Sequence, residues 1–331
     1  MTVPLVSVNM ITYNHAPYIA GAIEGVLQQK TSFPFELVIG EDCSTDGTRD
    51  IVLDYQKKHP DIIRVIMSDK NVGMKMNGNR TRKASRGKYI AVCEGDDYWH
   101  HPGKLQRQAE YLETHPECGL VFSSYDVYHV RSKKRIKDFI KYRKWVIPEK
   151  WDVSDIVEGK HGILTCTVMA RRALCDQIIE TDPYLYQSDQ FLMGDTQLWA
   201  EIAVVAELHY ISESLATHII TDESATRSRD IKKRLRFAIS GAELMIYLCK
   251  KYDLPSSLRK MHQATWCNYS LKYSFYSKSA KIADEVLRKN KTFTWKQWLW
   301  YYGAKYVTFC PLHAAACLIL NLFGKRQNPW L

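Results

Sequence analysis

Short runs of apolar and β-branched residues alternate along the chain with segments whose apolar side chains recur at helical spacing. Residues 5–11 predict a strand, and residues 18–28 predict a helix with one apolar stripe. The same order of strand and helix recurs down to about residue 225, as is typical of α/β sheets. Beyond residue 228 the pattern is entirely helical. We therefore predict an α/β fold followed by a helical C-terminal region.

The other elements of the α/β part follow from the same two patterns and from turn residues between them. The predicted strands are residues 37–40, 62–67, 89–93, 119–123, 163–169 and 208–212. The predicted helices are residues 49–58, a helix within the polar segment 71–86, residues 104–114, residues 171–179 and a helix that begins at 194–195.

Charge divides the chain into two parts. Residues 1–226 hold 26 Lys and Arg against 31 Asp and Glu, whereas residues 227–331 hold 20 against 5. The overall charge of +10 therefore hides a net −5 in the first part and +15 in the second. We predict a catalytic domain over residues 1–226 and a basic, aromatic-rich helical region over residues 227–331.

Composition excludes several classes of protein. Of the 331 residues, 46% are hydrophobic and 25% are charged, which is typical of globular proteins and not of disordered chains. The nine cysteines form no CxxC pair and no zinc-ligand spacing, and the first residues lack the pattern of a secretory signal. These features favour the reducing cytosol.

Acidic residues follow two of the predicted strands. Asp42 follows residues 37–40, and the adjacent Asp96 and Asp97 follow residues 89–93. Ligands of open α/β sheets bind at the carboxyl ends of the strands, and two neighbouring carboxylates favour a divalent cation that bridges to phosphates. A solvated acidic turn is the alternative for such a pair. Neither a dinucleotide-binding glycine motif nor a P-loop is present.

Four blocks in a fixed order carry a resemblance to a known family. They are VSV at 6–8 with YN at 13–14, ELVIGEDCSTDGT at 36–48, GKYI at 87–90, and EGDDYW at 94–99 with PGKL at 102–105. Over about residues 3–225 the chain resembles the family 2 glycosyltransferases, of the type that builds bacterial surface polysaccharides. The resemblance implies an inverting enzyme with the GT-A fold, in which a Rossmann-like, mostly parallel sheet is flanked by helices.

The resemblance also implies how the nucleotide is bound. Tyr13 would stack on the base, because an aromatic face offers stacking energy to any base. Asp42 would accept the N3–H of uracil or thymine. Asn79 stands where the family has a polar residue near the nucleotide, and Asp96 would contact the ribose or the ligands around the metal.

The remaining roles concern the metal and the reaction. Asp97 would hold a divalent cation, Mn²⁺ or Mg²⁺, against the diphosphate, and His218 stands where some relatives have a metal-proximal histidine. A purely structural role for His218 stays open. A fifth block, GD at 194–195 with LW at 198–199, makes Asp195 the expected general base.

Some positions depart from the family pattern or keep two interpretations. Glu41 and Glu94 stand where the family often has Asp, so we expect them to support the site and not to bind directly. Trp99 is either a core residue or a platform for the acceptor. The basic run 131–144 is either a solvated surface or an acceptor-side loop whose cations contact phosphates.

The C-terminal part suggests a membrane surface. Residues 306–323 carry no charge, are flanked by basic and aromatic residues, and are interrupted by Pro311 and His313. We expect residues 291–331 to lie in a membrane interface and not to span the bilayer. The alternatives are packing on the catalytic domain or on a second copy of the chain, as in a homo-oligomer. No nucleic-acid-binding signature accompanies the charge.

Together these features predict a metal-dependent, inverting glycosyltransferase. The donor would be a UDP- or dTDP-sugar, and the acceptor a hydroxyl of a glycan that is linked to polyprenyl diphosphate. The enzyme would be cytoplasmic and peripheral on the inner face of the cell membrane, in surface polysaccharide synthesis. A non-catalytic protein of the same fold that binds nucleotide or glycan is the first alternative, and a basic nucleic-acid-binding protein the second.

Overall fold

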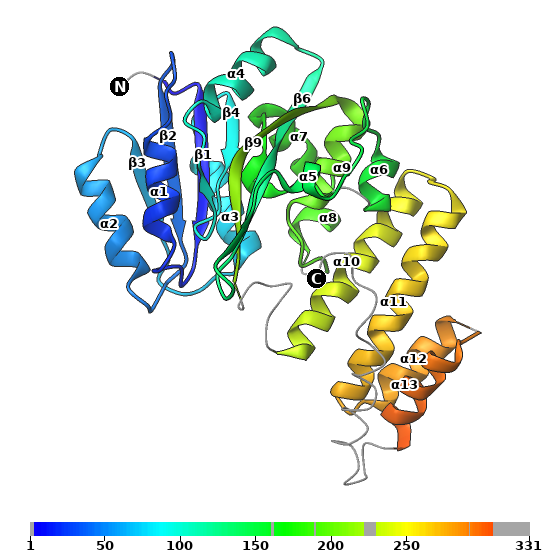
Figure 1. The fold of residues 1–331 in the computed structure, drawn as a ribbon. Coiled ribbons are helices and arrows are strands. Elements are labelled where there is room, and N and C mark those ends of the chain that lie inside the picture. The colour runs from blue at the N-terminus through cyan, green and yellow to red at the C-terminus, as the bar shows by residue number, and fades with distance from the viewer. Residues whose placement is uncertain (1–2, 160–161, 189, 222–229, 291, 307–331) are drawn as a thin grey trace. The chain divides into compact units, whose positions relative to one another are not determined.

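The structure is a computed structural model that describes residues 3–159, 162–188, 190–221, 230–290 and 292–306. It divides into two compact units, Met1–Thr221 and Asp222–Leu331 (Figure 1). The division predicted after residue 226 lies close to this boundary.

In the described residues of the first unit, nine strands form one sheet in the order β3-β2-β1-β4-β8-β6-β9-β5, with β7 paired to β6. The strands are β1 (Val6–Thr12), β2 (Phe35–Glu41), β3 (Ile63–Met67), β4 (Tyr89–Val92), β5 (Tyr98–Trp99), β6 (Cys118–His129), β7 (Lys134–Ile136), β8 (Met169–Arg171) and β9 (Glu207–Ile220). The first four strands along the chain pair in parallel, whereas β8 runs antiparallel to both of its neighbours.

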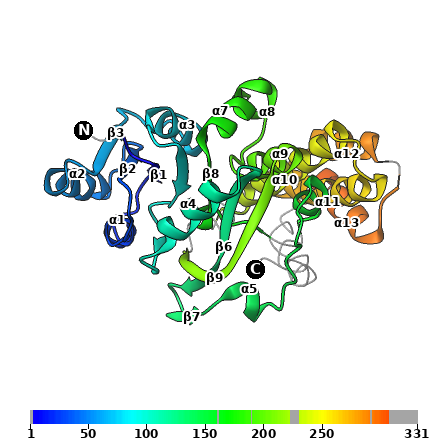
Figure 2. The ribbon, with the colours of Figure 1, turned by 90° about the horizontal axis from the view of Figure 1, so that it is seen from above.

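Helices cover both faces of the sheet. They are α1 (Ile19–Leu27), α2 (Thr48–Lys58), α3 (Met74–Ala84), α4 (Lys104–Thr114), α5 (Phe139–Tyr142), α6 (Val153–Glu158), the short 3₁₀ helix η1 (Thr165–Thr167), α7 (Arg172–Thr181), α8 (Pro183–Gln187) and α9 (Thr196–Val205). Figure 2 shows α1 and α4 on one side of the sheet, and α3, α7 and α8 on the other. This layered arrangement confirms the predicted α/β sheet flanked by helices.

The core explains why these segments became strands and helices. Both faces of β1 are buried, as expected of a parallel strand with helices on both sides. Val6, Val8 and Met10 on one face have no exposed surface, and Ser7 and Asn9 on the other face are 0% and 8% exposed. The predicted stripe of α1 packs onto the same core. A side chain at Gly25 would come within 2.7 Å of the Trp99 carbonyl oxygen, so α1 contacts β5 closely only because this position is glycine.

Two predictions about elements need correction. Residues 163–169 do not form a strand: they contain η1, and β8 begins only at Met169. Cys166, Thr167 and Val168 are buried all the same, so burial produced the apolar pattern without strand pairing. In addition, β6 and β9 are much longer than the strands predicted at 119–123 and 208–212. The two strands pair in parallel as far as His129 and Ile220.

The second unit is helical in its described part, as predicted. It contains α10 (Ile231–Lys251), α11 (Ser256–Tyr276), α12 (Ala280–Lys289) and α13 (Trp295–Tyr306). Its core is aromatic, with Phe275 and Trp300 in edge-to-face contact at 5.2 Å between ring centres. None of the described helices combines the length and the low charge that a membrane span needs. The uncharged run beyond Tyr306 lies outside the described residues.

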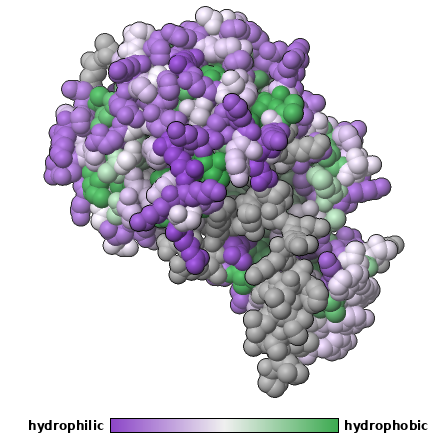
Figure 3. Space-filling view, viewed as in Figure 1, coloured by the Kyte–Doolittle hydropathy of each residue, from purple (hydrophilic) through white to green (hydrophobic). Residues whose placement is uncertain are grey.

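The surface and the thiols fit an ordinary globular protein. On the face seen in Figure 3, hydrophilic residues predominate and hydrophobic residues occur in separate patches. The seven cysteines within the described residues are free thiols.

Candidate active site

The acidic loop between β4 and β5 is held against the end of β1. The amide of Cys93 donates to the carbonyl of Asn9 at 3.1 Å, and the amide of Gly95 donates to that of Ile11 at 3.0 Å. A side chain at Gly95 would lie 2.8 Å from the Thr12 hydroxyl, so glycine allows this close approach. The loop therefore presents Asp96 and Asp97 at the carboxyl edge of the parallel strands, where ligands of such sheets bind.

Asp97 joins this loop to β9. Its side chain is only 3% exposed, and Oδ1 accepts the amide of Ile219 at 2.8 Å. His218 Nδ1 lies 3.0 Å from the same oxygen and 3.2 Å from Oδ2. The structure thus brings together the two residues expected beside the metal, although 121 positions separate them in sequence.

The carboxylates of the loop repel one another. Burial, followed by the charges of Asp97, Asp96 and Asp195, raises the pKa of Glu94 well above its usual range. Burial and the charge of Asp97 also raise the pKa of Asp96, against the lowering influence of His15 and His218. Because the charge of Asp195 acts on Glu94, the expected base and the acidic loop belong to one electrostatic site.

Asp195 caps the N-terminus of α9 and is held by a second element. One carboxylate oxygen accepts the amide of Thr196 at 2.6 Å, and the other accepts the hydroxyl of Thr165 at 2.7 Å. Thr165 belongs to η1, and sequence analysis did not identify it. A lone threonine in an apolar run carries no signal for a partner 30 residues away.

Hydrogen bonds fix the 3₁₀ helix η1 to β5, the strand that follows the acidic loop, and to α4. Trp99 Nε1 donates to the carbonyl of Cys166 at 2.8 Å, and Gln108 Nε2 donates to that of Thr167 at 2.7 Å. Trp99 has no exposed surface, so it is a core residue and not a platform for an acceptor. This chain of contacts sets the position of Asp195 relative to the loop that carries Asp97.

The expected nucleotide-binding residues lie at the ends of β1 and β2, which pair side by side up to Thr12 and Glu41. Tyr13 follows β1 and is 42% exposed, which leaves its ring available to a ligand. Asp42 follows β2, and its two oxygens accept the amides of Val72 and Gly73, each at 2.9 Å. The Asp42 side chain is only 2% exposed, and each carboxylate oxygen keeps a second lone pair that can accept another donor.

Asn79 is less closely tied to this group. It lies within α3 and is half-buried, and its side chain makes no hydrogen bond in the described part of the chain. Its neighbour on that helix, Asn77, is buried and donates to the carbonyl of Gly40 at 2.8 Å. The nucleotide-proximal role of Asn79 therefore stays a prediction.

Glu41 has a structural role. Its side chain is buried, where one oxygen accepts the amide of Ser44 at 2.7 Å and the other accepts Arg49 Nε at 2.5 Å. The loop after β2 is tied to the loop after β1 as well, because Asp46 accepts the amide of Ala16 at 2.9 Å. These bonds fix the two loops that carry Tyr13 and Asp42.

A divalent cation fits the donors around Asp97. One carboxylate and one imidazole meet there, beside two further carboxylates whose repulsion a cation would relieve. Within the described residues no group of three side chains forms a complete metal site. Such a low donor count suits Mn²⁺ or Mg²⁺, which take their remaining ligands from water and substrate phosphates.

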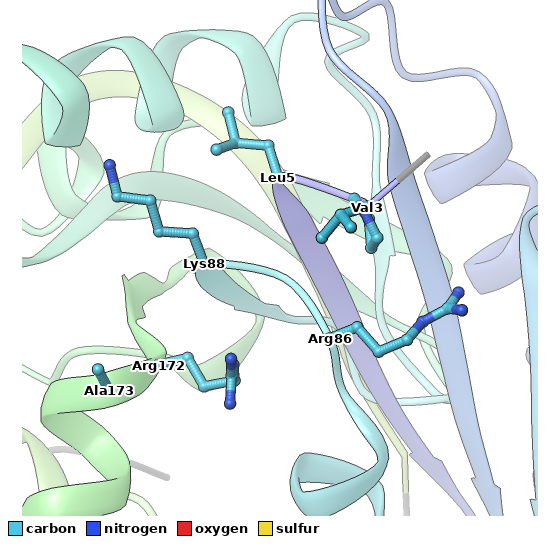
Figure 4. A pocket seen from close by; sticks show the side chains of 7 residues that line it. Val3, Leu5, Arg86, Lys88, Arg172 and Ala173 are labelled. Atoms are coloured by element: carbon cyan, nitrogen blue, oxygen red, sulfur yellow. The ribbon is translucent and has the colours of Figure 1, made fainter. Parts of the chain in front are cut away.

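A hollow of about 460 Å³ lies at the opposite edge of the sheet. Figure 4 shows Arg86, Lys88 and Arg172 around it, near the amino ends of β1 and β4. Arg86 pairs with Glu36 at 2.8 Å and Lys88 with Glu113 at 2.8 Å. Because the hollow lies away from the strand ends that carry the acidic loop, it does not belong to the candidate active site.

Comparison with known protein families decides the class of the chain. The model of glycosyl transferase family 2 matches residues 7–178. This range includes the acidic loop and the two loops that carry Tyr13 and Asp42. The chain belongs to glycosyl transferase family 2. This result confirms the resemblance that the sequence blocks indicated.

Curated relatives share part of the chain. The putative teichuronic acid biosynthesis glycosyltransferase TuaG of Bacillus subtilis is 34% identical over 178 residues, 53% of this chain and 65% of TuaG. The glucosyltransferase WfaP of Escherichia coli is 33% identical over 136 residues, 41% of this chain and 49% of WfaP. Uncharacterized mycobacterial proteins are 42% identical over 116 residues, so the chain spans about a third of their length (34%).

Solved structures share the fold over almost the whole chain. Residues 1–349 of S. aureus TarS, in complex with UDP, are 18% identical, with a TM-score of 0.54 over 98% of this chain and 92% of that fragment. The mannosyltransferase PcManGT of Pyrobaculum calidifontis, in complex with GDP-Man and Mn²⁺, is 16% identical, with a TM-score of 0.54 over 98% of this chain and 89% of PcManGT. At these identities the likeness establishes the GT-A fold.

Proposed function

We propose that the chain is a metal-dependent, inverting glycosyltransferase that moves a sugar from a UDP- or dTDP-sugar to a hydroxyl of a glycan acceptor. The observation that carries the proposal is the chain of contacts that joins Asp195 to the acidic loop. Thr165 of η1 donates to Asp195, and Trp99, two residues after Asp97, donates to Cys166 of the same 3₁₀ helix. The leaving diphosphate and the incoming hydroxyl can then be held next to each other, as a single displacement requires.

The reaction needs one proton transfer and one displacement. Asp195 accepts the proton of the acceptor hydroxyl as that oxygen forms its bond to the anomeric carbon of the sugar. The bond between this carbon and the nucleoside diphosphate breaks on the opposite face, so the anomeric configuration inverts. Thr165 and the amide of Thr196 orient the carboxylate of Asp195 for this step.

Asp97 and His218 are the residues that would hold the divalent cation. The ion, when bound, neutralises charge on the departing diphosphate. Asp97 is suited to the task because the amide of Ile219 and the packing of β9 fix its position, while His218 remains about one third exposed (34%). PcManGT, which shares the fold, binds Mn²⁺.

A uracil or thymine base is the proposed nucleotide partner. Asp42 accepts hydrogen bonds and donates none when ionised, so it selects a base that presents an N–H. Tyr13 supplies the stacking surface beside it. TarS binds UDP and PcManGT binds GDP-Man, so the fold itself accepts both nucleotides. Asp42 discriminates against cytosine, which has no N3–H to donate.

The proposed acceptor is a glycan on polyprenyl diphosphate, at the cytoplasmic face of the membrane. WfaP acts on a sugar diphosphoundecaprenol, and TuaG is assigned to teichuronic acid biosynthesis. The second unit supports a membrane surface through one face of α13. Its exposed members are Trp295, Leu299, Tyr302 and Tyr306, which recur at helical spacing.

A panel of nucleotide sugars tests the proposal most broadly. The purified chain is incubated with Mn²⁺ or Mg²⁺ and with UDP-, dTDP-, GDP- and CMP-sugars, and release of the nucleotide is measured with and without glycan acceptors. We expect UDP- or dTDP-sugars to be consumed and GDP-sugars to be left. Consumption of a CMP-sugar alone would contradict the role of Asp42, and consumption of a GDP-sugar alone would contradict the proposed donor class. Binding without turnover of any donor would favour a non-catalytic protein.

A further inference from the structure

The segment of residues 131–146, between β6 and α6, combines exposed cations with exposed apolar side chains. Its first fourteen residues contain eight Lys and Arg against one Asp. Lys134, Lys137 and Lys141 are exposed and form no ion pair within the described part of the chain. Tyr142 is 59% exposed and Val146 is 82% exposed. Exposed cations and exposed apolar side chains therefore occur together in this segment.

The segment is a fixed part of the fold. Ile140 is only 5% exposed and packs with Tyr125 and Val127 of β6. The amide of Asp138 donates to Asp126 at 2.8 Å. The rings of Phe139 and Trp145 meet edge to face at 5.8 Å between centres. The exposed cations and apolar side chains of residues 131–146 are therefore held in place by packing against β6.

Strand register places residues 131–146 beside the candidate active site. Val127 of β6 pairs with His218 on one side and with Ile136 of β7 on the other, and paired residues share one face of a sheet. Two strand spacings separate His218 from Ile136, which is roughly 10 Å. Leu164 packs against the same cluster, and it precedes Thr165, which orients Asp195.

We propose that residues 131–146 form a surface that binds the phosphate groups of anionic lipid headgroups, so that the active site meets its acceptor at the membrane. Lysine ammonium groups attract headgroup phosphates, while Tyr142 and Val146 enter the interface between headgroups and acyl chains. The inference rests on the proposed lipid-linked acceptor, since a soluble acceptor would need no such surface next to Asp195 and His218.

Binding of the full chain to vesicles tests this surface without any requirement for catalysis. The probe is a vesicle of phosphatidylglycerol and phosphatidylcholine, with pure phosphatidylcholine as reference, in a co-sedimentation assay at low salt. The variant is Lys134→Glu/Lys137→Glu/Lys141→Glu. The matched control is Lys30→Glu/Lys57→Glu/Lys83→Glu, in which three exposed lysines near the amino ends of the strands undergo the same change of charge.

We expect the variant to bind anionic vesicles at least about a hundredfold more weakly, since each basic residue near the surface contributes roughly fivefold. The control should stay within a few-fold of the parent chain, and both variants should melt at the parent temperature. Equal losses in the two variants would overturn the proposal, because they would reflect overall charge alone. Binding unchanged in the variant would overturn it as well.

Two further measurements distinguish anionic lipid from free phosphate and from nucleic acid as the ligand of this surface. Inorganic phosphate should displace the chain from vesicles no better than sodium chloride of the same ionic strength; stronger displacement by phosphate would indicate a free-phosphate site instead. A mixed-sequence RNA that binds the parent but not the variant, with vesicle binding retained, would assign the surface to nucleic acid. Failure to find any sugar transfer would contradict the proposed function but would leave the vesicle result intact.

Discussion

At the residue scale, the pKa of Glu94 reflects the repulsion between the carboxylates of the site. It is half-buried beside Asp96 and Asp97, and the charge of Asp195 acts on it too. Because the folded chain raises its pKa, the folded state holds the proton more tightly than the unfolded chain does. The free energy of unfolding therefore falls as pH rises from the ordinary glutamate pKa through the raised value.

Replacement of Glu94 by Gln should stabilise the protein at neutral pH. The amide cannot ionise, so it avoids the charged form that the folded site disfavours, and each unit of pKa shift corresponds to about 1.4 kcal/mol. We expect a gain of about 1–2 kcal/mol at pH 7.5 and little gain near pH 4, where Glu94 is protonated in both states. Urea unfolding at the two pH values measures it.

The control for this change is Glu117→Gln at an exposed position. Added Mn²⁺ should shrink the gain of Glu94→Gln, because a bound cation relieves the same repulsion. A loss of stability at pH 7.5 would contradict the proposed charge balance.

Much of the candidate site could be predicted from single residues. The rule that ligands bind at strand ends, together with the family blocks, located Asp42, Asp96, Asp97 and Asp195, and the structure brings the last three into one electrostatic site. Thr165 could not be predicted, since its importance comes from a hydrogen bond across the fold and not from a local pattern. The roles of the site residues in binding and catalysis stay predictions.

At the scale of elements, the first turn of α4 packs against β5, the strand that follows the acidic loop. Lys104 is fully buried, its ammonium lies 4.2 Å from the ring centre of Trp99, and it donates to Gln108 Oε1 at 2.6 Å. Burial lowers the pKa of Lys104 to about 7. The unfolded chain therefore binds more protons than the folded chain between about pH 7 and the ordinary lysine pKa.

This shift makes the contribution of Lys104 to stability depend on pH. As pH rises from 7 to 8.5, the free energy of unfolding of the parent chain should increase relative to that of Lys104→Met by about 1–2 kcal/mol. Denaturant unfolding of both proteins at the two pH values checks this, with the exposed Lys57→Met as control. A difference that does not change with pH would mean that Lys104 keeps its ordinary pKa.

Most elements of the first unit could be predicted because each has its own local pattern. The helix predicted at 104–114 has the same bounds as α4, and the predicted strand 62–67 differs from β3 by one residue. β5 has only two residues and pairs with β9, so no local run could indicate it. The predicted strand 163–169 failed because buried 3₁₀ and extended segments share the apolar composition of a strand.

At the scale of the whole molecule, the two units differ in charge as the sequence indicated. The boundary lies at Thr221, and the second unit places an exposed apolar stripe on α13. Trp295 and Tyr306 are 62% and 63% exposed, whereas Trp300 on the opposite face is 7% exposed. An aromatic outer face on a basic unit is typical of attachment to an anionic membrane surface.

Truncation of this stripe should weaken membrane binding without unfolding the unit. For Trp295→Ala/Leu299→Ala/Tyr306→Ala we expect at least about a tenfold loss of binding to phosphatidylglycerol vesicles, because apolar area no longer enters the interface. The melting temperature should stay nearly unchanged, since the three side chains are exposed. Flotation of vesicles with bound protein measures the loss.

The matched control replaces three exposed apolar residues elsewhere, as Met261→Ala/Val204→Ala/Val205→Ala. Equal binding by the stripe variant and the parent chain would rule out α13 as a membrane surface. It would favour the alternatives of packing within the protein or on a second copy of the chain.

The most direct test of the central claim, that one cleft joins nucleotide binding to an acid–base residue, is calorimetry and transfer assays on Asp195→Asn and Asp97→Asn. Asparagine still caps a helix, so Asp195→Asn should fold normally. We expect Asp195→Asn to bind UDP with Mn²⁺ as the parent does while transfer falls about 10²–10⁴-fold, and Asp97→Asn to lose UDP affinity. Full transfer by Asp195→Asn, or unchanged Mn²⁺-dependent UDP binding by Asp97→Asn, would contradict the account.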